Sequence, residues 1–265
     1  MKAVASRLLL TSALLLISVA PICGAEGDLA RQATAKVSAK SAELANTPIR
    51  YTCRITQGIH KDADSTASHL LAPTASVVSV CTATLHGKKA RYESVRLDTG
   101  ERMTEVCDGT TRWVCRDPGN GQLPKESRGA MDKTAGRFTP WVGMVYLTRP
   151  LTDPAYEESA SAGKSDLVEY TANGAGSDRR QTLLLDKTKD FAVTKRTNEW
   201  SGTWNGWEFG EFVSVKGIWL PTHAVYNHGM PPGVGTTVMV YDDTKYTVLS
   251  PEEAAKAFVI PAAAQ

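Results

Sequence analysis

Alternation of apolar and polar residues is clearest between residues 76 and 118, where runs rich in Val, Thr, Tyr, Arg and Trp are separated by short turn signals. The turn signals are His86-Gly87-Lys88, Asp98-Thr99-Gly100 and Asp108-Gly109, and each contains a residue that tolerates a positive φ angle. Connections this short join neighbouring antiparallel strands. The stretch therefore predicts a four-stranded meander.

Further strand-like runs lie on both sides of this meander. They comprise residues 49–57 before it and residues 167–172, 180–185, 191–197, 207–215, 218–226 and 234–241 after it. Together with the meander, these runs predict roughly eleven strands. A mainly β (α+β) fold is therefore expected.

The segment from Asp28 to Asn46 shows helical periodicity. Asp28 is a suitable N-cap, and Thr47-Pro48 ends the predicted helix. Its apolar stripe is narrow and consists of Leu29, Ala33, Val37 and Leu44. We expect this helix to lie over a larger element and to contribute one thin face to the core.

Start signals for two short helices lie between the two series of strands. Thr139-Pro140 supplies an N-cap and a first-turn proline, and Asp153-Pro154 repeats the signal. The first of these helices carries the apolar residues Trp141, Met144, Val145 and Leu147. Near the C-terminal end, residues 250–253 form a capping box, and an extended apolar segment follows at 257–261.

Residues 1–25 show the pattern of a cleaved secretory signal peptide. Lys2 and Arg7 precede an apolar run that is shorter than the roughly 20 residues of a membrane-spanning helix. We therefore expect an exported, periplasmic protein whose residues 26–265 form a single domain. Cys23 leaves a lipid-anchored form as an alternative, which the bulky Ile22 before it disfavours.

The charge balance excludes one class of partner. The chain has 30 Lys and Arg against 28 Asp and Glu, and removal of Lys2 and Arg7 leaves 28 against 28. A formally neutral exported chain lacks the clustered positive charge on which nucleic-acid binding depends. We expect no nucleic-acid partner.

Four cysteines lie in the exported part, and an even number in an oxidising compartment suggests two disulfides. The candidates are Cys53, Cys81, Cys107 and Cys115. The preferred pairing is Cys53 with Cys81 and Cys107 with Cys115, although the second pair requires a longer loop than a two-residue turn at Asp108-Gly109. Free buried thiols are the alternative, and zinc is disfavoured because no CxxC spacing occurs.

Signals for catalysis are weak. Asp98-Thr99-Gly100 matches the aspartic-protease triplet, but such sites need two carboxylates and the sequence holds no second copy. His223 and His228 would point to opposite faces of one strand, which disfavours a shared metal. Neither G-x-S-x-G nor HExxH occurs. We expect no enzyme activity, metal or cofactor, with an unrecognised hydrolase as the less favoured alternative.

The order of these features resembles the LolA/LolB-like outer-membrane lipoprotein carriers. The matching residues are Asp108-Gly109, Trp113 and Asp117-Pro118, then Gly217 and Pro221, then Phe258 and Pro261. The resemblance implies an unclosed antiparallel β-barrel with a helical lid and an apolar cavity for acyl chains. It also implies a carrier of lipids or lipoproteins, acting as a monomer between membrane-bound donor and acceptor proteins in outer-membrane lipoprotein sorting.

Alternation and helix spacing select the apolar residues expected to line this cavity. They are Trp113, Trp141, Met144, Leu147, Trp207 and Phe209. Strand alternation places Trp207 and Phe209 on one face. The same rings also suit an ordinary sheet core.

The sequence departs from the carriers in its added cysteines, in Arg112, which precedes Trp113 where an apolar residue is usual, and in one turn, so a divergent member of the family is expected. These proteins resemble one another in an Arg-Pro step that ties the barrel to its lid, whereas this chain has Gly87-Lys88-Lys89-Ala90-Arg91 without a proline. Lys89 and Arg91 are the candidates to replace this latch. A role similar to that of RseB, as a periplasmic sensor or partner-binding protein, is the alternative function.

Overall fold

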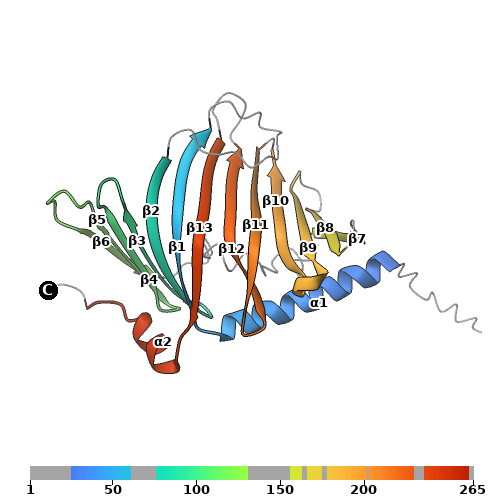
Figure 1. Cartoon of the computed structure of the whole chain (residues 1–265), viewed down its shortest axis with the longest axis horizontal. Coiled ribbons are helices and arrows are strands. Elements are labelled where there is room, and N and C mark those ends of the chain that lie inside the picture. Colours follow the sequence, from blue (N-terminus) through green and yellow to red (C-terminus); the bar gives the residue numbers. More distant parts are fainter. Residues whose placement is uncertain are drawn as a thin grey trace, which may run out of the picture.

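The computed structural model describes residues 25–60, 76–130, 156–162, 166–174, 178–201, 203–229 and 236–262. Within these ranges, thirteen strands form one antiparallel sheet (Figure 1). Its edge strands, β6 and β7, do not pair with each other, so the sheet is not closed. The predicted fold class, a mainly β protein with an unclosed antiparallel sheet, is confirmed.

The N-terminal half of the sheet is a meander. Its strands are β1 (Ile49–His60), β2 (Ser76–His86), β3 (Lys89–Arg96), β4 (Arg102–Cys107), β5 (Thr111–Asp117) and β6 (Lys125–Ala130). Strands β2 to β5 are the four predicted from residues 76 to 118. Strand β6 was missed, because all six of its residues are exposed and the strand has no apolar face to reveal it.

The C-terminal half is a second meander. Its strands are β7 (Tyr156–Ala162), β8 (Leu167–Gly174), β9 (Arg180–Asp186), β10 (Ala192–Trp200), β11 (Thr203–Val215), β12 (Ile218–Gly229) and β13 (Thr236–Val248). A short 3-10 helix, Lys187–Lys189, joins β9 to β10. The helix predicted to begin at Asp153-Pro154 is wrong over residues 156–162, which pair with β8 as a strand. The other short helix, at residues 139–147, lies outside the described residues.

The two meanders meet where the first and last strands pair. The strand order is β6-β5-β4-β3-β2-β1-β13-β12-β11-β10-β9-β8-β7. Ile49 lies opposite Val248, and the pairing continues to His60 opposite Thr236, with one irregularity between Thr52 and Arg54. The centre of the sheet therefore joins segments from the two ends of the folded chain.

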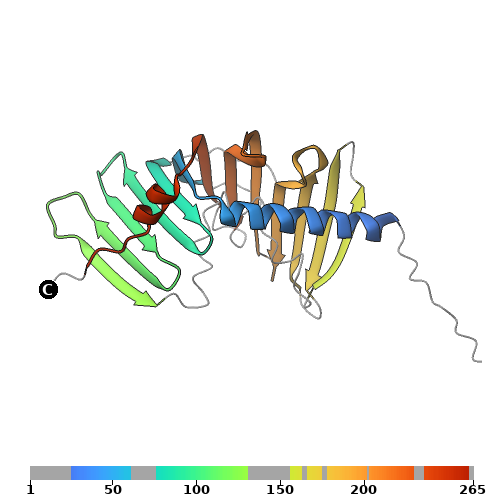
Figure 2. The same ribbon diagram turned by 90° about the horizontal axis from the view of Figure 1, so that it is seen from below.

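Helix α1 (Ala25–Asn46) begins three residues before the predicted start and covers one face of the sheet. Its buried residues are Ala33, Val37 and Leu44, which belong to the predicted stripe and pack in the main apolar core. We call the face that α1 covers the inner face and the opposite one the outer face. In Figure 2, α1 runs across the orange and yellow strands of the C-terminal half.

The C-terminal part of α1 is fixed to the turns of three hairpins. The backbone N–H of Gly87 donates to Ala45 O at 2.7 Å. Lys40 Nζ donates to Gly217 O at 2.9 Å and forms an ion pair with Asp190 at 3.5 Å. The helix thus connects turns from both halves of the sheet. In the described ranges, no helix is both long enough and apolar enough to cross a membrane.

Helix α2 (Pro251–Ala257) lies on the outer face of the N-terminal half. Ser250 Oγ accepts a hydrogen bond from the Glu253 N–H at 3.2 Å, and Glu253 accepts one from the Ser250 N–H at 2.9 Å. The predicted capping box is confirmed. Beyond the helix, Arg128 of β6 donates to Pro261 O, which holds the final segment against the edge of the sheet.

Candidate functional site

An aromatic cluster occupies the inner face on β11, β12 and β13. The ring of Trp207 stacks on Phe209 with centroids 5.8 Å apart, and it lies 4.7 Å from Tyr226 and 5.5 Å from Tyr241. The register produces this cluster, because Trp207 lies opposite Tyr226, and Phe209 and Tyr241 lie opposite the same residue, Ala224. The predicted shared face of Trp207 and Phe209 is confirmed. Burial raises the pKa of Tyr226 and of Tyr241, so both rings remain neutral.

A row of polar side chains borders this cluster. The register aligns Gln181 on β9, Asn198 on β10, Asn205 on β11 and His228 on β12. The side-chain amides of Asn198 and Asn205 are hydrogen-bonded to each other at 2.6 Å. The buried Nδ1 atom of His228 has no hydrogen-bond partner among the described residues. The row therefore offers amide and imidazole groups beside an apolar wall.

Arg196 lies between this polar row and the aromatic cluster, directly opposite Trp207 on the neighbouring strand. With the Gln181 amide oxygen facing the guanidinium, this oxygen accepts hydrogen bonds from Arg196 Nε at 3.1 Å and Nη2 at 2.8 Å. Burial lowers the pKa of Arg196 to about 10, so the side chain remains charged at neutral pH. Within the described ranges, no carboxylate forms an ion pair with it.

Trp113 does not belong to this cluster. Successive cross-strand pairs from Cys53 through Cys81, Ser94 and Met103 lead to Arg116, which places Arg116 on the inner face and Trp113 on the outer face. The prediction that Trp113 lines one pocket with Trp207 and Phe209 is therefore wrong. Trp113 is nevertheless buried, and its Nε1 donates to Glu126 Oε2 at 3.2 Å.

The other predicted pocket residues lie outside the described residues. These are Trp141, Met144 and Leu147. Their place in a lid remains a prediction.

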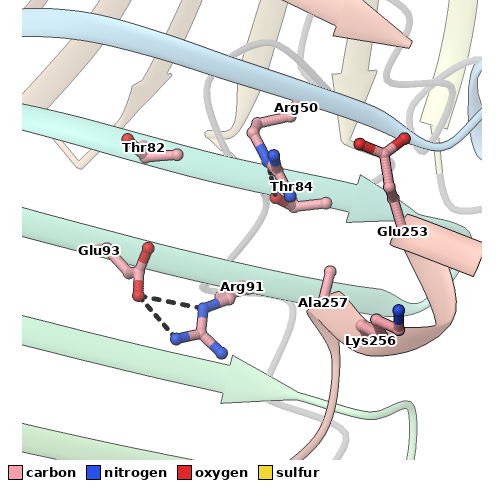
Figure 3. Close-up of a pocket in the computed structure, with 8 residues that line it drawn as sticks. All are labelled: Arg50, Thr82, Thr84, Arg91, Glu93, Glu253, Lys256 and Ala257. Atoms are coloured by element: carbon pink, nitrogen blue, oxygen red, sulfur yellow. Dashed lines mark hydrogen bonds and ion pairs between the residues drawn. The ribbon is translucent and has the colours of Figure 1, made fainter. Parts of the chain in front are cut away.

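The two latch candidates lie near the β2–β3 turn. Lys89 is exposed, and Arg91 forms an ion pair with Glu93 at 2.6 Å. Arg91 points to the outer face, where it lines a groove beneath α2 (Figure 3). In the described part of the chain, no hydrogen bond or ion pair joins either residue to α1, and a latch to residues 139–147 remains a prediction.

The groove beneath α2 has a volume of about 430 Å³, and all but one of its lining residues have polar or charged side chains. Figure 3 shows its lining from β1, β2, β3 and α2: Arg50, Thr82, Thr84, Arg91, Glu93, Glu253, Lys256 and Ala257. Arg50 Nε makes one long hydrogen bond, of 3.5 Å, to Thr84 Oγ1. Hydrogen bonds to Ser250 lower the pKa of Glu253, so this carboxylate stays ionised and hydrogen-bonded in the helix cap.

Cys53 and Cys81 lie directly opposite each other on β1 and β2, with their sulfur atoms 2.9 Å apart. This contact lowers the pKa of Cys81. None of the four cysteines in the described part forms a disulfide. Because the register places these two as neighbours, a Cys53–Cys81 bond remains a prediction.

The predicted pairing of Cys107 with Cys115 is wrong. Cys107 lies opposite Arg112 and Cys115 lies opposite Thr104, so the two cysteines are three residue pairs apart and point to opposite faces. Three strand positions correspond to about 10 Å, which a disulfide cannot bridge. The turn is longer than the two residues of Asp108-Gly109 because Asp108 accepts hydrogen bonds from the N–H groups of Thr110 and Thr111.

The histidines and the Asp-Thr-Gly triplet show no catalytic arrangement in the described part. His223 and His228 point to opposite faces, as alternation predicted, and His223 Nδ1 contacts Asp242 Oδ1 at 2.6 Å. Asp98-Thr99-Gly100 is a turn closed by a hydrogen bond from the Gly100 N–H to Arg96 O. The described residues contain no group of three His, Cys, Asp or Glu side chains arranged to hold a metal.

The polar row and Arg196 were missed in the sequence. Their signal is weak, because polar residues in strands usually indicate the solvent-facing side. Extending the alternation of Trp207 across the β10–β11 pair would have placed Arg196 on the inner face. Finding that pair requires the register, which the sequence does not display.

Comparison with solved structures returns folds of similar outline. One match is a LolA superfamily protein from Nitrosomonas europaea, at 15% identity and a TM-score of 0.47. The match covers 86% of this chain and 97% of that protein. A second match is a DUF1329 family protein from Desulfovibrio piger, at 11% identity and a TM-score of 0.48. This match covers 87% of this chain and 99% of that protein.

A third match is a chain of the Pseudomonas aeruginosa MucA/MucB complex, at 10% identity and a TM-score of 0.29, with 88% and 99% of the two chains covered. No family model matches the sequence, and no curated protein matches it either. A protein of the LolA superfamily, which the sequence resembles, is thus among the matches. At these identities and scores, the likeness concerns the overall fold and says nothing about ligands.

Proposed function

We propose that this protein is an exported binding protein that holds the acyl chains of a lipid or lipoprotein against the inner face of its sheet. The observation that carries this proposal is the aromatic cluster around Trp207, which continues through Tyr226 to His228 and Trp200. This surface extends over several strands. It is larger than one helix with a thin apolar stripe can cover.

Simple dimensions support this step. Thirteen strands at about 4.8 Å spacing span roughly 60 Å along the sheet, whereas a helix of 22 residues is about 33 Å long. Ala33 and Val37, which α1 buries, are small. Acyl chains are suited to cover the rest of the inner face, because each buried methylene contributes about 0.8 kcal/mol to the binding free energy and needs no hydrogen-bond partner.

Export and carriage complete the proposal. In this proposal, residues 1–25 direct the chain to the periplasm. The lid predicted at residues 139–147 lies outside the described residues and remains a prediction. Transfer between membrane-bound donor and acceptor proteins is the specific role that the sequence resemblance favours. Such transfer requires no catalytic residue.

Native mass spectrometry of the mature protein, purified gently from its own periplasm, tests the proposal. We expect a near-stoichiometric acylated species that lipid extraction releases and identifies. Protein stripped of lipid should then take up dodecanoate, measured by calorimetry. An empty protein that also fails to bind dodecanoate would contradict acyl binding and would mean that the inner face is a closed core.

The groove beneath α2 favours partner binding as the second candidate function. It lies on the outer face, away from the aromatic cluster, and its charged lining residues are Arg50, Arg91, Lys256, Glu93 and Glu253. Arg91 and Glu93 neutralise each other in an ion pair. Lys256 forms an ion pair of 2.6 Å with Glu252, so Arg50 is the lining cation for which the described residues provide no ion pair. Partner binding would be favoured if another protein co-purifies with the wild type, is lost from the Arg50→Glu variant, and no lipid is bound.

A further inference from the structure

The inner face carries a positive charge that the binding of an acyl chain does not explain. Arg196 extends from β10 toward the same face as Trp207, its cross-strand neighbour. A cation taken out of water is unfavourable unless a carboxylate or a similar group compensates it. In the part of the chain that the structure describes, the Arg196 guanidinium is hydrogen-bonded to the neutral amide of Gln181.

The preceding residue shows that this strand can compensate a charge. Lys195 points to the outer face and forms an ion pair of 2.7 Å with Glu208, the residue opposite it on β11. Arg196 has Trp207 at the equivalent position. The outward cation is thus neutralised by its neighbour, whereas the inward cation is held beside an aromatic ring.

The surroundings of Arg196 are arranged like one side of an anion site. Gln181 fixes the guanidinium through hydrogen bonds of 2.8 and 3.1 Å. The amide row continues through Asn198 and Asn205 to His228, whose buried Nδ1 has no partner among the described residues. A guanidinium presents paired N–H donors that match the oxygens of a carboxylate or phosphate.

We propose that Arg196 binds the anionic head group of an amphiphilic ligand whose acyl chain lies on the aromatic cluster around Trp207, with the Asn198–Asn205–His228 row providing further polar contacts. This inference rests on the proposed function and makes it more specific. The shared chemistry is a carboxylate or phosphate attached to an alkyl chain. A free fatty acid and a phospholipid are the two sources of such a group.

Three ligands with one alkyl chain separate these possibilities: dodecanoate, dodecyl phosphate and dodecan-1-ol, each titrated into the full mature protein below its micelle concentration. The wild type should bind at least one of the two anions about tenfold or more tightly than the alcohol. The more tightly bound anion identifies the source of the head group. Arg196→Gln should lose this preference and keep the affinity for the alcohol.

Lys195→Gln is the matched control, because it removes a positive charge from the adjacent residue on the outer face. It should retain the preference for anions. Arg196→Lys keeps the charge without the paired donors and should retain part of the preference, which provides a readout if Arg196→Gln does not fold.

The outcomes distinguish this inference from the function on which it rests. If the wild type binds all three ligands equally, or if Arg196→Gln and Arg196→Lys both keep the full preference, the head-group site is wrong and acyl binding stands. If none of the three ligands binds, acyl binding fails and the head-group site fails with it.

Discussion

Two arginines on the inner face, one in each half of the sheet, differ in whether a carboxylate lies beside them. In the N-terminal half, Arg112 Nε lies 2.5 Å from Oε1 of Glu105, a residue only 2% exposed. In the C-terminal half, Arg196 lies among amides and aromatic rings, and the described residues bring no carboxylate to it. Both halves are antiparallel meanders, so topology does not explain the difference.

The two halves therefore differ in how the described residues pair the charges of the inner face. In the N-terminal half, the inward Arg112 is paired with Glu105 and helix α2 lies on the outer face. In the C-terminal half, the described residues provide an aromatic surface and an inward cation, Arg196, without a carboxylate partner, and helix α1 lies on the inner face. A ligand that is apolar at one end and anionic at the other would complete the second half and would have no place in the first.

Replacement of one tryptophan in each half should produce the largest effect. Trp207→Ala and Trp113→Ala each remove a ring that is 8% exposed, and each should lower the free energy of unfolding by about 3–5 kcal/mol. Only Trp207→Ala should weaken the binding of dodecanoate, because Trp113 lies on the outer face. Urea unfolding and calorimetric titration measure the two quantities.

The two tryptophan variants serve as controls for each other, since their expected losses of stability are similar. An equal loss of dodecanoate affinity in both would mean that binding follows overall stability. In that case the inner face would have no special role in binding.

The two arginines should differ in stability as well. Arg112→Gln leaves the carboxylate of Glu105 buried without its charged partner and should cost about 2 kcal/mol, less than for a fully buried pair because Arg112 is half exposed. Arg196→Gln removes a charge without a described ionic partner and should change stability by less than about 1 kcal/mol. Equal losses in urea unfolding would show that Arg196 has a structural ion partner.

The smallest effect concerns pH and the hairpin turns of the two halves. Burial raises the pKa of Asp186, but hydrogen bonds from Lys189 and Thr188 outweigh burial and hold this pKa below its ordinary value of 3.8. A lowered pKa stabilises the fold above pH 3.8, and this contribution is lost as the pH falls through the lower value of the folded state. Asp186→Asn should therefore be about 1 kcal/mol less stable than the wild type at pH 6, and this gap should narrow as the pH falls below 3.8.

Asp108 is the matching residue in the N-terminal half. Hydrogen bonds from the N–H groups of Thr111 and Thr110 also lower its pKa, but the side chain is exposed. Asp108→Asn should show a smaller gap to the wild type at pH 6, measured by urea unfolding. A gap for Asp186→Asn that does not change with pH would mean that its charge makes no contribution.

The sequence predicted the elements that have a regular pattern. The meander from residue 76, the helix with Val37 in its stripe and the capping box at Ser250 all depend on interactions between residues close in sequence. The two edge strands were missed for the opposite reason. Residues 125–130 are fully exposed and residues 156–162 consist mainly of small and polar residues, so neither has an apolar face.

The site was predicted less well than the fold, because it depends on register. Alternation paired Trp207 with Phe209 correctly, since both are on one strand. Whether Trp113 shares their face depends on the cross-strand pairs of the six strands between β5 and β11, and the sequence does not specify these. For the same reason the sequence did not identify Arg196 as a site residue, because its position on the inner face follows from its pairing with Trp207.

Pairing of β1 with β13 at the centre of the sheet has a consequence for how the chain folds. Each half can form its hairpins locally and early, but the ladder that joins the halves needs residues from both ends of the folded chain. Until β13 is present, both half-sheets expose unpaired edges at the position that becomes the middle. The late arrival of the last strand should therefore keep the chain open during synthesis, a state that suits the export proposed above.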